Sequence, residues 1–411
     1  MANVSSSNGL EKYPKLRFKG FSEPWTQVLL SDIFKKSTKK NSDGSITNVI
    51  CNSAKNGLIP QREYFDKSIA NSDNTDGYYI IEQGDFVYNP RKSSDAPYGP
   101  VSIYKYPESG IVSPLYLCFR ALNPVNSSFY DYFFKSPSWH RYIYLSGDSG
   151  ARHDRVSIKD DVFFAMPVNI PSEKEQKRIA SFLILIEERI AHQQALVEHL
   201  KKYKRGLLNR YFRSNVGDCK YIPLSELILE IMDGDWIESK DQSSFGIRLI
   251  QTGNVGVGEY IDKPDSAKYI SASTFEHLHC TEIYPGDILI SRLPSPAGRA
   301  CIVPITNERM ITAVDCTIVR CDDTRCIREY LIQFLNSPQY FKEVESFLAG
   351  GTRQRISRKN LESILVPIVQ LPEQKHIANI LSTFDKKIHN EAEQLQELIR
   401  YKRGLLQALF V

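Results

Sequence analysis

Apolar residues recur at steps of three and four in two stretches of the chain, which predicts two long amphipathic helices. Over residues 166–213 the apolar positions are Ile179, Leu183, Ile186, Ile190, Val197 and Leu200. Over residues 366–411 they are Ile377, Leu381, Phe384, Ile388, Leu395 and Leu398. This spacing is typical of the heptad seam of a coiled coil. One such helix would expose its apolar stripe, whereas two in one chain can bury each other's stripes.

The two helical stretches are copies of each other. The hexamer Tyr-Lys-Arg-Gly-Leu-Leu occupies residues 203–208 and again residues 401–406, and the alignment runs without a gap from Glu175 and Glu373 onward. Both stretches begin after a proline, which suits the first turn of a helix. The chain is therefore an internal duplication.

Both copies also share one polar position in the seam and one glycine position. The apolar seam is interrupted at the same place in each copy, by Gln193 and by Glu391, and a polar residue in a seam can fix register and partner. Gly206 and Gly404 indicate either a helix end or a point of close approach. An alternative remains open, in which each helix packs only on its own domain.

The segments that precede the helices, residues 15–165 and 214–365, have a mixed pattern. Short β-branched and aromatic runs bounded by Gly, Pro and Asp predict strands, and each segment contains a helical stretch broken at Ser-Pro. The predicted fold is α+β. It has an N-terminal tail over residues 1–14, two mixed globular domains, and two long helices, 166–213 and 366–411, that form an antiparallel coiled coil. The two copies are expected to be related by a pseudo-twofold axis.

Composition limits the possible partners. The 411 residues carry a formal net charge of only +4, so an anionic partner must be met by a local basic patch. The eight cysteines include no C-x-x-C pair, and Cys316, Cys321 and Cys326 match no common zinc spacing, so we expect buried thiols and no metal. No apolar run is long enough for a signal peptide or a membrane span, and we expect a cytoplasmic protein.

The sequence motifs of common enzymes are missing. The chain has no Gly-Lys pair, so it lacks the lysine of a phosphate-binding loop, and it has no H-E-x-x-H motif. The string Tyr-Asn-Pro-Arg at residue 88 does not match the motif with which amino-methyltransferases hold a flipped base, and Pro-Asp-Ser-Ala-Lys at residue 264 lacks the further carboxylate of a nuclease. We predict no catalytic residue in this chain.

Arginine-bearing loops are the strongest candidates for a binding site. Arg152 and Arg155 follow glycines in the first domain, and Arg353 and Arg355 do so in the second. Glycine lets a backbone approach a phosphate, and the guanidinium fork suits phosphate or the edge of guanine. A salt-bridged surface loop is the alternative interpretation.

A second pair of loops offers further basic and amide groups. Residues 88–99 and 291–299 are matching turns, and short loops near residues 52 and 251 carry amides of the kind that read adenine or guanine. Such amides also cap loops. The candidates on these loops are Tyr88, Arg91, Lys92, Arg292, Arg299, Asn52, Lys55, Gln251 and Asn254.

Over essentially its whole length the chain resembles the specificity subunit of type I restriction-modification enzymes. The residues that carry the resemblance are the paired Tyr-Lys-Arg-Gly-Leu-Leu helices, Pro-Lys-Leu-Arg-Phe-Lys-Gly-Phe at residue 14, Gly-Asp-Phe-Val-Tyr-Asn-Pro-Arg at residue 84, and the proline entries followed by Glu-Gln. The resemblance implies two target-recognition domains, each reading one half of a split, asymmetric site in double-stranded DNA. It also implies that the helix pair sets the spacing between the half-sites.

The resemblance further implies the partners. Two methyltransferase subunits would use S-adenosylmethionine, and restriction subunits would use ATP and Mg for translocation and cleavage, so this chain itself would hold no cofactor. Two other functions remain open on the sequence alone. One is a coiled-coil scaffold without a nucleic-acid role, and the other is an autonomous DNA-modifying enzyme.

Overall fold

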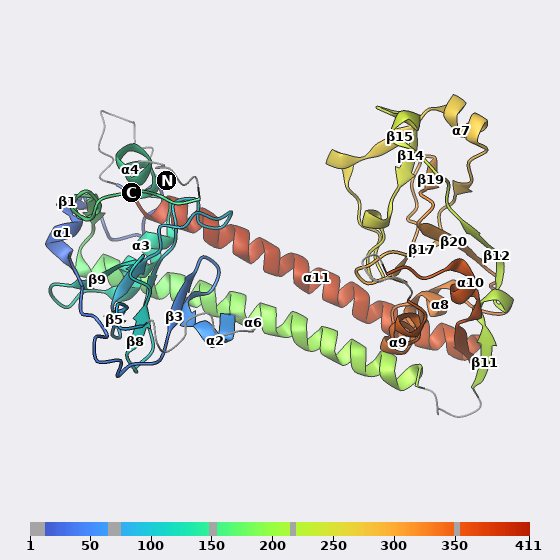
Figure 1. Cartoon of the computed structure of the whole chain (residues 1–411), viewed down its shortest axis with the longest axis horizontal. Coiled ribbons are helices and arrows are strands. Elements are labelled where there is room, and N and C mark those ends of the chain that lie inside the picture. Colours follow the sequence, from blue (N-terminus) through green and yellow to red (C-terminus); the bar gives the residue numbers. More distant parts are fainter. Residues whose placement is uncertain (1–12, 65–74, 148–153, 214–218, 349–353) are drawn as a thin grey trace. The chain divides into compact units, whose positions relative to one another are not determined.

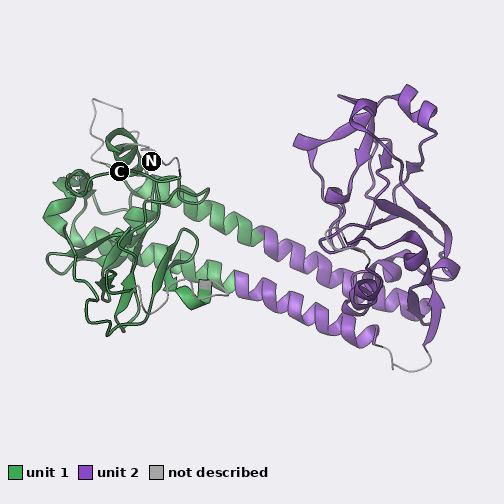
Figure 2. Ribbon diagram, viewed as in Figure 1, with its two compact units in different colours: residues 1–193, 394–411 green, residues 194–393 purple. Residues whose placement is uncertain are grey.

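The computed structural model describes residues 13–64, 75–147, 154–213, 219–348 and 354–411. Figure 2 shows two compact units, which we call unit 1 (residues 1–193 with 394–411) and unit 2 (residues 194–393). Each unit combines helices with short, mostly antiparallel strands, so the predicted α+β class is confirmed. Most of the predicted tail, residues 1–12, lies outside the described residues.

The central sheet has the same topology in both units. In unit 1 its order is β2 (Phe34–Lys36), β9 (Leu117–Ala121), β6 (Phe86–Tyr88) and β7 (Val101–Ile103). In unit 2 it is β12 (Ile228–Asp233), β20 (Cys316–Cys321), β17 (Ile288–Ser291) and β18 (Ala300–Ile302). Of these strands, Figure 1 labels β9, β12, β17 and β20. All neighbouring strands in both sheets are antiparallel. The duplication therefore extends through the globular parts.

An equivalent ion pair crosses both sheets. Arg120 of β9 lies 2.6 Å from Asp85, which precedes β6, and Arg320 of β20 lies 3.4 Å from Asp287, which precedes β17. The pairing raises the pKa of Arg120, chiefly through its hydrogen bond to Asp85. The same charge pair thus stabilises the same strand crossing in each copy.

The outer strands have diverged. Unit 1 has the hairpin of β3 (Ile50–Ser53) and β4 (Gly57–Pro60) and the pair of β5 (Tyr79–Ile81) and β8 (Gly110–Val112). Unit 2 has one five-stranded sheet, in the order β13 (Gln242–Ser243), β15 (Lys268–Ile270), β14 (Ile247–Ile250), β19 (Met310–Thr312) and β16 (Glu282–Ile283). These strands and their loops carry four of the candidate binding residues, Asn52, Lys55, Gln251 and Asn254.

Both long helices form, but each begins later than predicted. Helix α6 spans Glu173–Tyr211 and α11 spans Leu371–Leu409. The first residues of both predicted stretches are strands instead. Strand β10 (Pro167–Ile170) pairs with β1 (Thr26–Leu29), and β21 (Leu365–Ile368) pairs with β11 (Lys220–Pro223). Among the described residues, no helix is long and apolar enough to cross a membrane.

The helical stretch broken at Ser-Pro is present in both units. In unit 1, α3 (Ser127–Lys135) ends before Ser136, and α4 (His140–Ser146) follows. In unit 2, α8 (Arg328–Phe334) is followed by α9 (Pro338–Phe347), which Ser337 caps. The remaining short helices are α1 (Leu30–Ile33), α2 (Gln61–Tyr64), α5 (Asp160–Phe164), α7 (Ala272–Leu278), α10 (Arg358–Ser363) and 3-10 turns at Leu224–Glu226, Ser239–Asp241, Thr252–Asn254 and Pro264–Ser266.

The core of each unit contains the ends of both long helices. In unit 1, Leu183 of α6 and Leu406 of α11 join an aromatic cluster, and the ring of Phe410 lies 5.3 Å from that of Phe129. In unit 2, Leu381 of α11 and Leu208 of α6 are buried, and the ring of Phe212 lies 5.3 Å from that of Tyr330. Every predicted seam residue is buried or half-buried.

Within each unit the two helices pair in antiparallel fashion. Unit 1 joins the N-terminal part of α6 to the C-terminal part of α11, where Lys402 lies 2.5 Å from Glu187. Unit 2 joins the opposite ends, where Lys204 pairs with Asp385 and the rings of Tyr203 and Phe384 lie 5.2 Å apart. The predicted antiparallel coiled coil is confirmed. The helices also pack on the domains, but the alternative in which each helix packs only on its own domain is wrong.

Truncating a helix residue in either core should unfold the chain more easily. Leu183 and Leu381 occupy aligned positions and are fully buried, so we expect Leu183→Ala or Leu381→Ala to lower the free energy of unfolding by about 2–5 kcal/mol. Leu185→Ala on the exposed face of α6, where the side chain is 61% exposed, should change it by less than about 0.5 kcal/mol. Denaturant titration measures both. An equal loss at Leu185 would contradict this packing.

Candidate nucleic-acid interface

A cleft of about 520 Å³ in unit 1 gathers five of the predicted binding residues. Its walls are β3 with the loop that follows it, the loop that follows β6, the loop between β8 and β9, and the segment before α5. The predicted residues that line it are Asn52, Lys55, Arg91, Lys92 and Arg155. Loops far apart in the sequence therefore meet at one place.

Backbone hydrogen bonds hold two of these loops together. The N–H of Lys92 donates to the carbonyl of Asp154 at 2.8 Å, and the N–H of Val156 donates to the carbonyl of Pro90 at 2.9 Å. Gly99 turns the chain back toward this junction with φ +83°, and a Cβ there would lie 2.1 Å from the carbonyl oxygen of Asn89. Only glycine fits that position.

The cleft is basic at its rim. The Arg91 side chain is 68% exposed and its nearest carboxylate, Asp154, lies 3.8 Å away. Lys55 is exposed and Lys92 is half-buried. The Nε of Arg155 is buried and has no hydrogen-bond partner among the described residues. Weakly paired cations on a concave surface are what phosphate oxygens bind.

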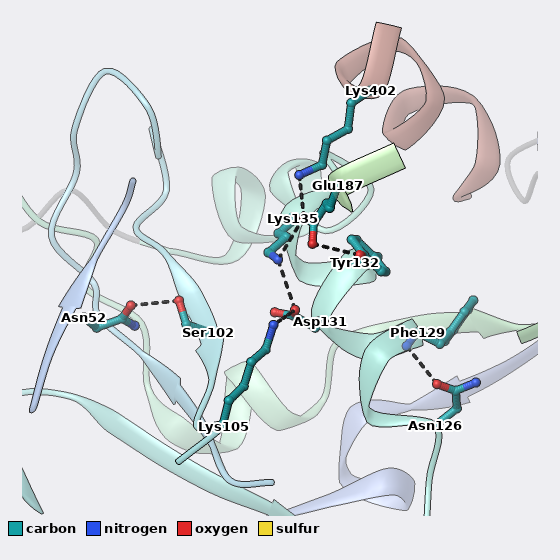
Figure 3. A network of polar contacts seen from close by, with 10 residues as sticks. All are labelled: Asn52, Ser102, Lys105, Asn126, Phe129, Asp131, Tyr132, Lys135, Glu187 and Lys402. Carbon is teal, nitrogen blue, oxygen red and sulfur yellow. Dashed lines mark hydrogen bonds and ion pairs between the residues drawn. The ribbon is translucent and has the colours of Figure 1, made fainter. Parts of the chain in front are cut away.

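Two of the predicted residues in unit 1 have structural roles instead. The amide of Asn52 is buried; its nitrogen donates to the carbonyls of Val87 (2.8 Å) and Pro100 (3.2 Å), and its oxygen accepts from the Ser102 hydroxyl at 2.8 Å (Figure 3). Tyr88 is 1% exposed, and its hydroxyl donates to the carbonyl of Tyr98. Burial raises the pKa of Tyr88. Neither side chain has a free edge to read a base.

The equivalent loops also meet in unit 2. The N–H of Ile356 donates to the carbonyl of Arg292 at 3.2 Å, as Val156 does to Pro90 in unit 1. Here, however, the arginines are paired with acids. Arg355 lies 3.1 Å from Asp315, and Arg292 lies 3.2 Å from Asp233.

Arg299, Arg292 and Asn254 were predicted as binding groups on turns, but their side chains are buried. The Arg299 guanidinium is 9% exposed and donates to the carbonyls of Val255, Leu293, Pro296 and Thr252 at 2.6–2.9 Å. Arg292 is 5% exposed and donates to the carbonyl of Val314. Burial lowers the pKa of both arginines. The Asn254 amide donates to the carbonyl of Ile261 at 2.9 Å and accepts from the N–H of Gln251. All three side chains stabilise loops.

A separate cleft of about 300 Å³ in unit 2 includes Gln251. Lys263 and Lys268 line the same cleft, and the sequence did not single them out. Lys263 lies in a loop and Lys268 is the first residue of β15. The sequence feature that could have identified them is a pair of lysines close to a glycine-containing turn. Arg358, 3.8 Å from Asp233, is a further basic group that we missed. Arg152 and Arg353 lie outside the described residues.

The cysteines do not converge on a site. Cys316, Cys326 and Cys280 belong to three different apolar clusters. Among the residues that the structure describes, no three His, Cys, Asp or Glu side chains are placed to hold a metal ion. Burial raises the pKa of the Cys316 thiol to about 11, as expected for a thiol that packs as an apolar group.

Known proteins share both the sequence pattern and the fold. The family profile for the type I restriction modification DNA specificity domain matches residues 228–400. The putative type I restriction enzyme MjaX specificity subunit of Methanocaldococcus jannaschii is 21% identical over 80% of this chain and 78% of its own length. The chain is therefore similar in sequence to type I restriction-modification specificity subunits, and residues 228–400 match the family's domain profile.

Other specificity subunits match over shorter stretches. The MjaVIII specificity subunit of the same organism is 21% identical over 61% of this chain, and the match spans 63% of that protein, which is less than two thirds of it. A putative specificity subunit of Haemophilus influenzae, S.HindORF215P, is 31% identical over 36% of this chain and 39% of its own length.

Solved structures share the fold over nearly the whole chain. The type I restriction-modification S subunit from M. genitalium covers 97% of this chain and 99% of its own, with a TM-score of 0.56 at 15% identity. A chain from work on complex assembly and conformational transition of the type I R-M system covers 94% and 98%, with a TM-score of 0.60 at 17% identity. Both globular parts and both long helices therefore belong to the shared fold.

Removing the exposed cations of the unit 1 cleft should weaken DNA binding. We expect Arg91→Ala with Lys92→Ala to lower the affinity of the assembled complex and to reduce the slope of log K against log[salt] by about 0.9 for each phosphate that the variant no longer neutralises. Lys177→Ala, an exposed lysine of α6 beside Glu173, removes a charge outside the cleft and should leave both unchanged. Binding isotherms at several salt concentrations test this. Equal effects at both places would exclude the cleft as the DNA-binding surface.

Proposed function

We propose that this chain is a specificity subunit that recognises DNA without catalysing a reaction, and that each globular domain reads one half of a bipartite, asymmetric site. The recognition domains are residues 15–165 and 214–365. The observation that carries the proposal is that two units share one sheet topology and the same junction of loops, while the side chains at that junction differ. Two readers of common descent with different surfaces fit a split site with unlike halves.

The contrast between the clefts supports unlike half-sites. In unit 1 the arginine and lysines of the cleft rim are exposed or weakly paired. In unit 2, Arg355 is held by Asp315, and the neighbouring cleft presents Gln251 with two lysines instead. Since hydrogen-bonding groups at base edges determine which base is read, these surfaces should select different sequences.

Mapping the modified bases tests this function directly. Methylated adenines sequenced from cells that express the assembled complex should define two short, unlike motifs separated by a fixed number of unspecified base pairs. A scaffold without a nucleic-acid role predicts no motif. Methyl transfer by the purified chain alone would support an autonomous enzyme and contradict the proposal. In our proposal S-adenosylmethionine is used by the two partner methyltransferase subunits, and ATP and Mg by the restriction subunits.

The helix pair has the role of a spacer in this proposal. Inserting one heptad into both α6 and α11 at aligned positions would lengthen the pair by about 10 Å, at 1.5 Å per residue. We expect the number of unspecified base pairs between the half-sites to change while both half-site sequences stay the same. Sequencing of methylated sites measures both properties at once. Changed half-sites at unchanged spacing would exclude the spacer role.

Two equivalent positions on the helices suit a partner that binds twice. Gly206 and Gly404 lie inside α6 and α11, so the helix-end interpretation is excluded. A Cβ at either glycine would meet no atom within 4 Å, and glycine inside a helix costs about 1 kcal/mol relative to alanine. Tyr203 and Tyr401, three residues earlier, are 60% and 55% exposed. Close approach of a methyltransferase subunit at each site would account for the repeated glycine.

Replacing these glycines should have opposite effects on folding and assembly. We expect Gly206→Ala with Gly404→Ala to raise the free energy of unfolding, by up to about 1 kcal/mol per site, yet to weaken binding of methyltransferase subunits through steric conflict. Gln407→Ala, also exposed on α11, is the control and should leave assembly unchanged. Denaturant titration and sedimentation of the mixed subunits give the two readouts. Unchanged assembly in the double variant would exclude close approach at the glycines.

A further inference from the structure

A carboxylate in unit 1 joins three helices (Figure 3). Glu187 of α6 accepts a hydrogen bond from the hydroxyl of Tyr132 on α3 at 2.9 Å, and its other oxygen lies 2.5 Å from the Nζ of Lys402 on α11. Lys135 of α3 lies 3.5 Å from the same oxygen. The Glu187 side chain is 33% exposed and that of Lys402 is 23% exposed. This cluster therefore links the helix pair to the domain that it enters.

Unit 2 contains the corresponding cluster with the helices exchanged. Asp385 of α11 accepts a hydrogen bond from the amide of Gln333 on α8 at 2.8 Å and pairs with Lys204 of α6. The Lys204 side chain is 14% exposed. Again one carboxylate receives a neutral donor from the domain and a cation from the other long helix.

The duplication relates the two clusters residue by residue. The alignment that places Tyr203 over Tyr401 also places Glu187 over Asp385 and Lys204 over Lys402. Tyr132 and Gln333 each lie four residues before the serine of Ser-Pro. The donor has changed from a phenol to an amide, but a donor is present in both. Each ion pair joins one copy of the repeat to the other.

The carboxylate of unit 1 stays charged. Burial alone would raise the pKa of Glu187, but Lys135 and Lys402, together with the Tyr132 hydrogen bond, lower it to about 2. A charged, half-buried carboxylate is strongly destabilised when its cation is removed, because its lost hydration is no longer compensated. Glu187 therefore favours any arrangement that keeps a cation beside it.

We propose that the Glu187–Lys402 and Asp385–Lys204 pairs lock the antiparallel register of α6 against α11. In an antiparallel helix pair, the numbers of two facing residues add up to a constant. The Glu187–Lys402 and Lys204–Asp385 pairs give the same sum, so both belong to one register. The apolar seam alone is less selective, because it repeats every three, four and seven residues and permits shifts by those steps.

Each permitted shift takes Lys402 away from Glu187 and leaves Lys135 of α3 as its remaining cation. A shift by three, four or seven residues in either direction places one of six residues of α11 opposite it, and all of them are aliphatic: Leu395, Leu398, Ile399, Leu405, Leu406 and Leu409. Lys402 would then face residues of α6 that carry no acid: Ala180, Leu183, Ile184, Ile190, Ala191 or Gln194. The unit 1 pair thus disfavours every shifted register.

The unit 2 pair is less selective by itself. A shift by three residues places Lys201 opposite Asp385, so the ion pair could form again. The same shift places Ile399 opposite Glu187, however, and the unit 1 pair opposes it. Together the two pairs accept only the register in which both carboxylates are neutralised, as charges at a coiled-coil interface do when they select one alignment.

The lock has a consequence for specificity that rests on the proposed function. If the helix pair sets the distance between half-sites, the two helices must adopt one register only for the complex to recognise one spacing. Residues 187, 204, 385 and 402 would then position the recognition domains without contacting DNA.

Charge exchange in the full chain, assembled with its partners, tests the lock. The variants are Glu187→Lys, Lys402→Glu and the two combined, with Glu188→Lys as the matched control on the exposed face of α6. A photo-reactive residue at Ile190 reports the register directly, because mass spectrometry identifies the residue of α11 to which it cross-links. Sequencing of methylated adenines in the same strains reports the spacing.

We expect each single variant to move the cross-link along α11 by three or four residues or to spread it over several, and to lower methylation at the native spacing about tenfold, the factor that 1.4 kcal/mol produces. The double variant should restore the native cross-link and bring methylation back to within about twofold of the unmodified chain, on the same energy scale. The control should change neither.

The outcomes separate the lock from the proposed function. An unchanged cross-link in the single variants, or a double variant that does not recover, overturns the lock whatever happens to DNA. A cross-link that moves while the methylated spacing stays constant supports the lock and overturns the spacer role of the helices. Single variants that fail to fold leave the double variant as the deciding case.

Discussion

The burial of both long helices in both globular cores is the constraint on which the other features depend. The core of unit 1 contains Leu183 from one copy of the repeat and Leu406 and Phe410 from the other. The core of unit 2 contains Leu381 and Leu208 in the reciprocal arrangement. Because each core is completed by a helix of the other copy, neither copy buries its own apolar surface alone. Each long helix must therefore fit two cores at once, one near each of its ends.

The globular parts are under no such reciprocal constraint. Their central sheets keep one topology and one Asp-Arg crossing, while the outer strands differ between a hairpin with a strand pair and a five-stranded sheet. The candidate binding loops connect to those outer strands and to the strands of the central sheet. Variation is thus concentrated where it changes the surface without disturbing the packing of α6 and α11.

The two long helices and their shared interface were predicted correctly, because they depend on the periodicity and the repetition of the sequence. The heptad spacing from Ile179 to Leu200 is a local signal, and its repeat at Ile377–Leu398 made a shared interface the simplest solution. The start of each helix was placed too early, because Pro167–Ile170 and Leu365–Ile368 pair with strands more than a hundred residues away. Nothing local distinguishes such a strand from the extended entry to a helix.

The candidate site was predicted less well, for a physical reason. An arginine on a loop can face solvent, as Arg91 does with its 68% exposure, or it can fold inward and bind loop carbonyls, as Arg299 does. Which of the two occurs depends on how many backbone carbonyls lack hydrogen-bond partners in the folded loop. Two of the carbonyls that Arg299 binds, those of Val255 and Thr252, come from a segment more than forty residues away, so the sequence near Arg299 does not reveal them. The amide of Asn52 was misjudged for the same reason, since its acceptors lie on β6 and before β7.

The donors to the carboxylates of Glu187 and Asp385 show how a changing domain can stay attached to a fixed helix pair. Glu187 and Asp385 each need one hydrogen bond from the domain and one cation from the opposite helix to remain satisfied. The cation belongs to the repeated hexamer and is the same in both copies. The domain donor is a phenol in one case and an amide in the other, and both groups can donate. The attachment therefore requires a hydrogen-bond donor at this position of the domain, and the donor can be a phenol or an amide. A recognition domain can change most of its surface and keep its place on the helices, which would let the bases that are read change independently of the distance between them.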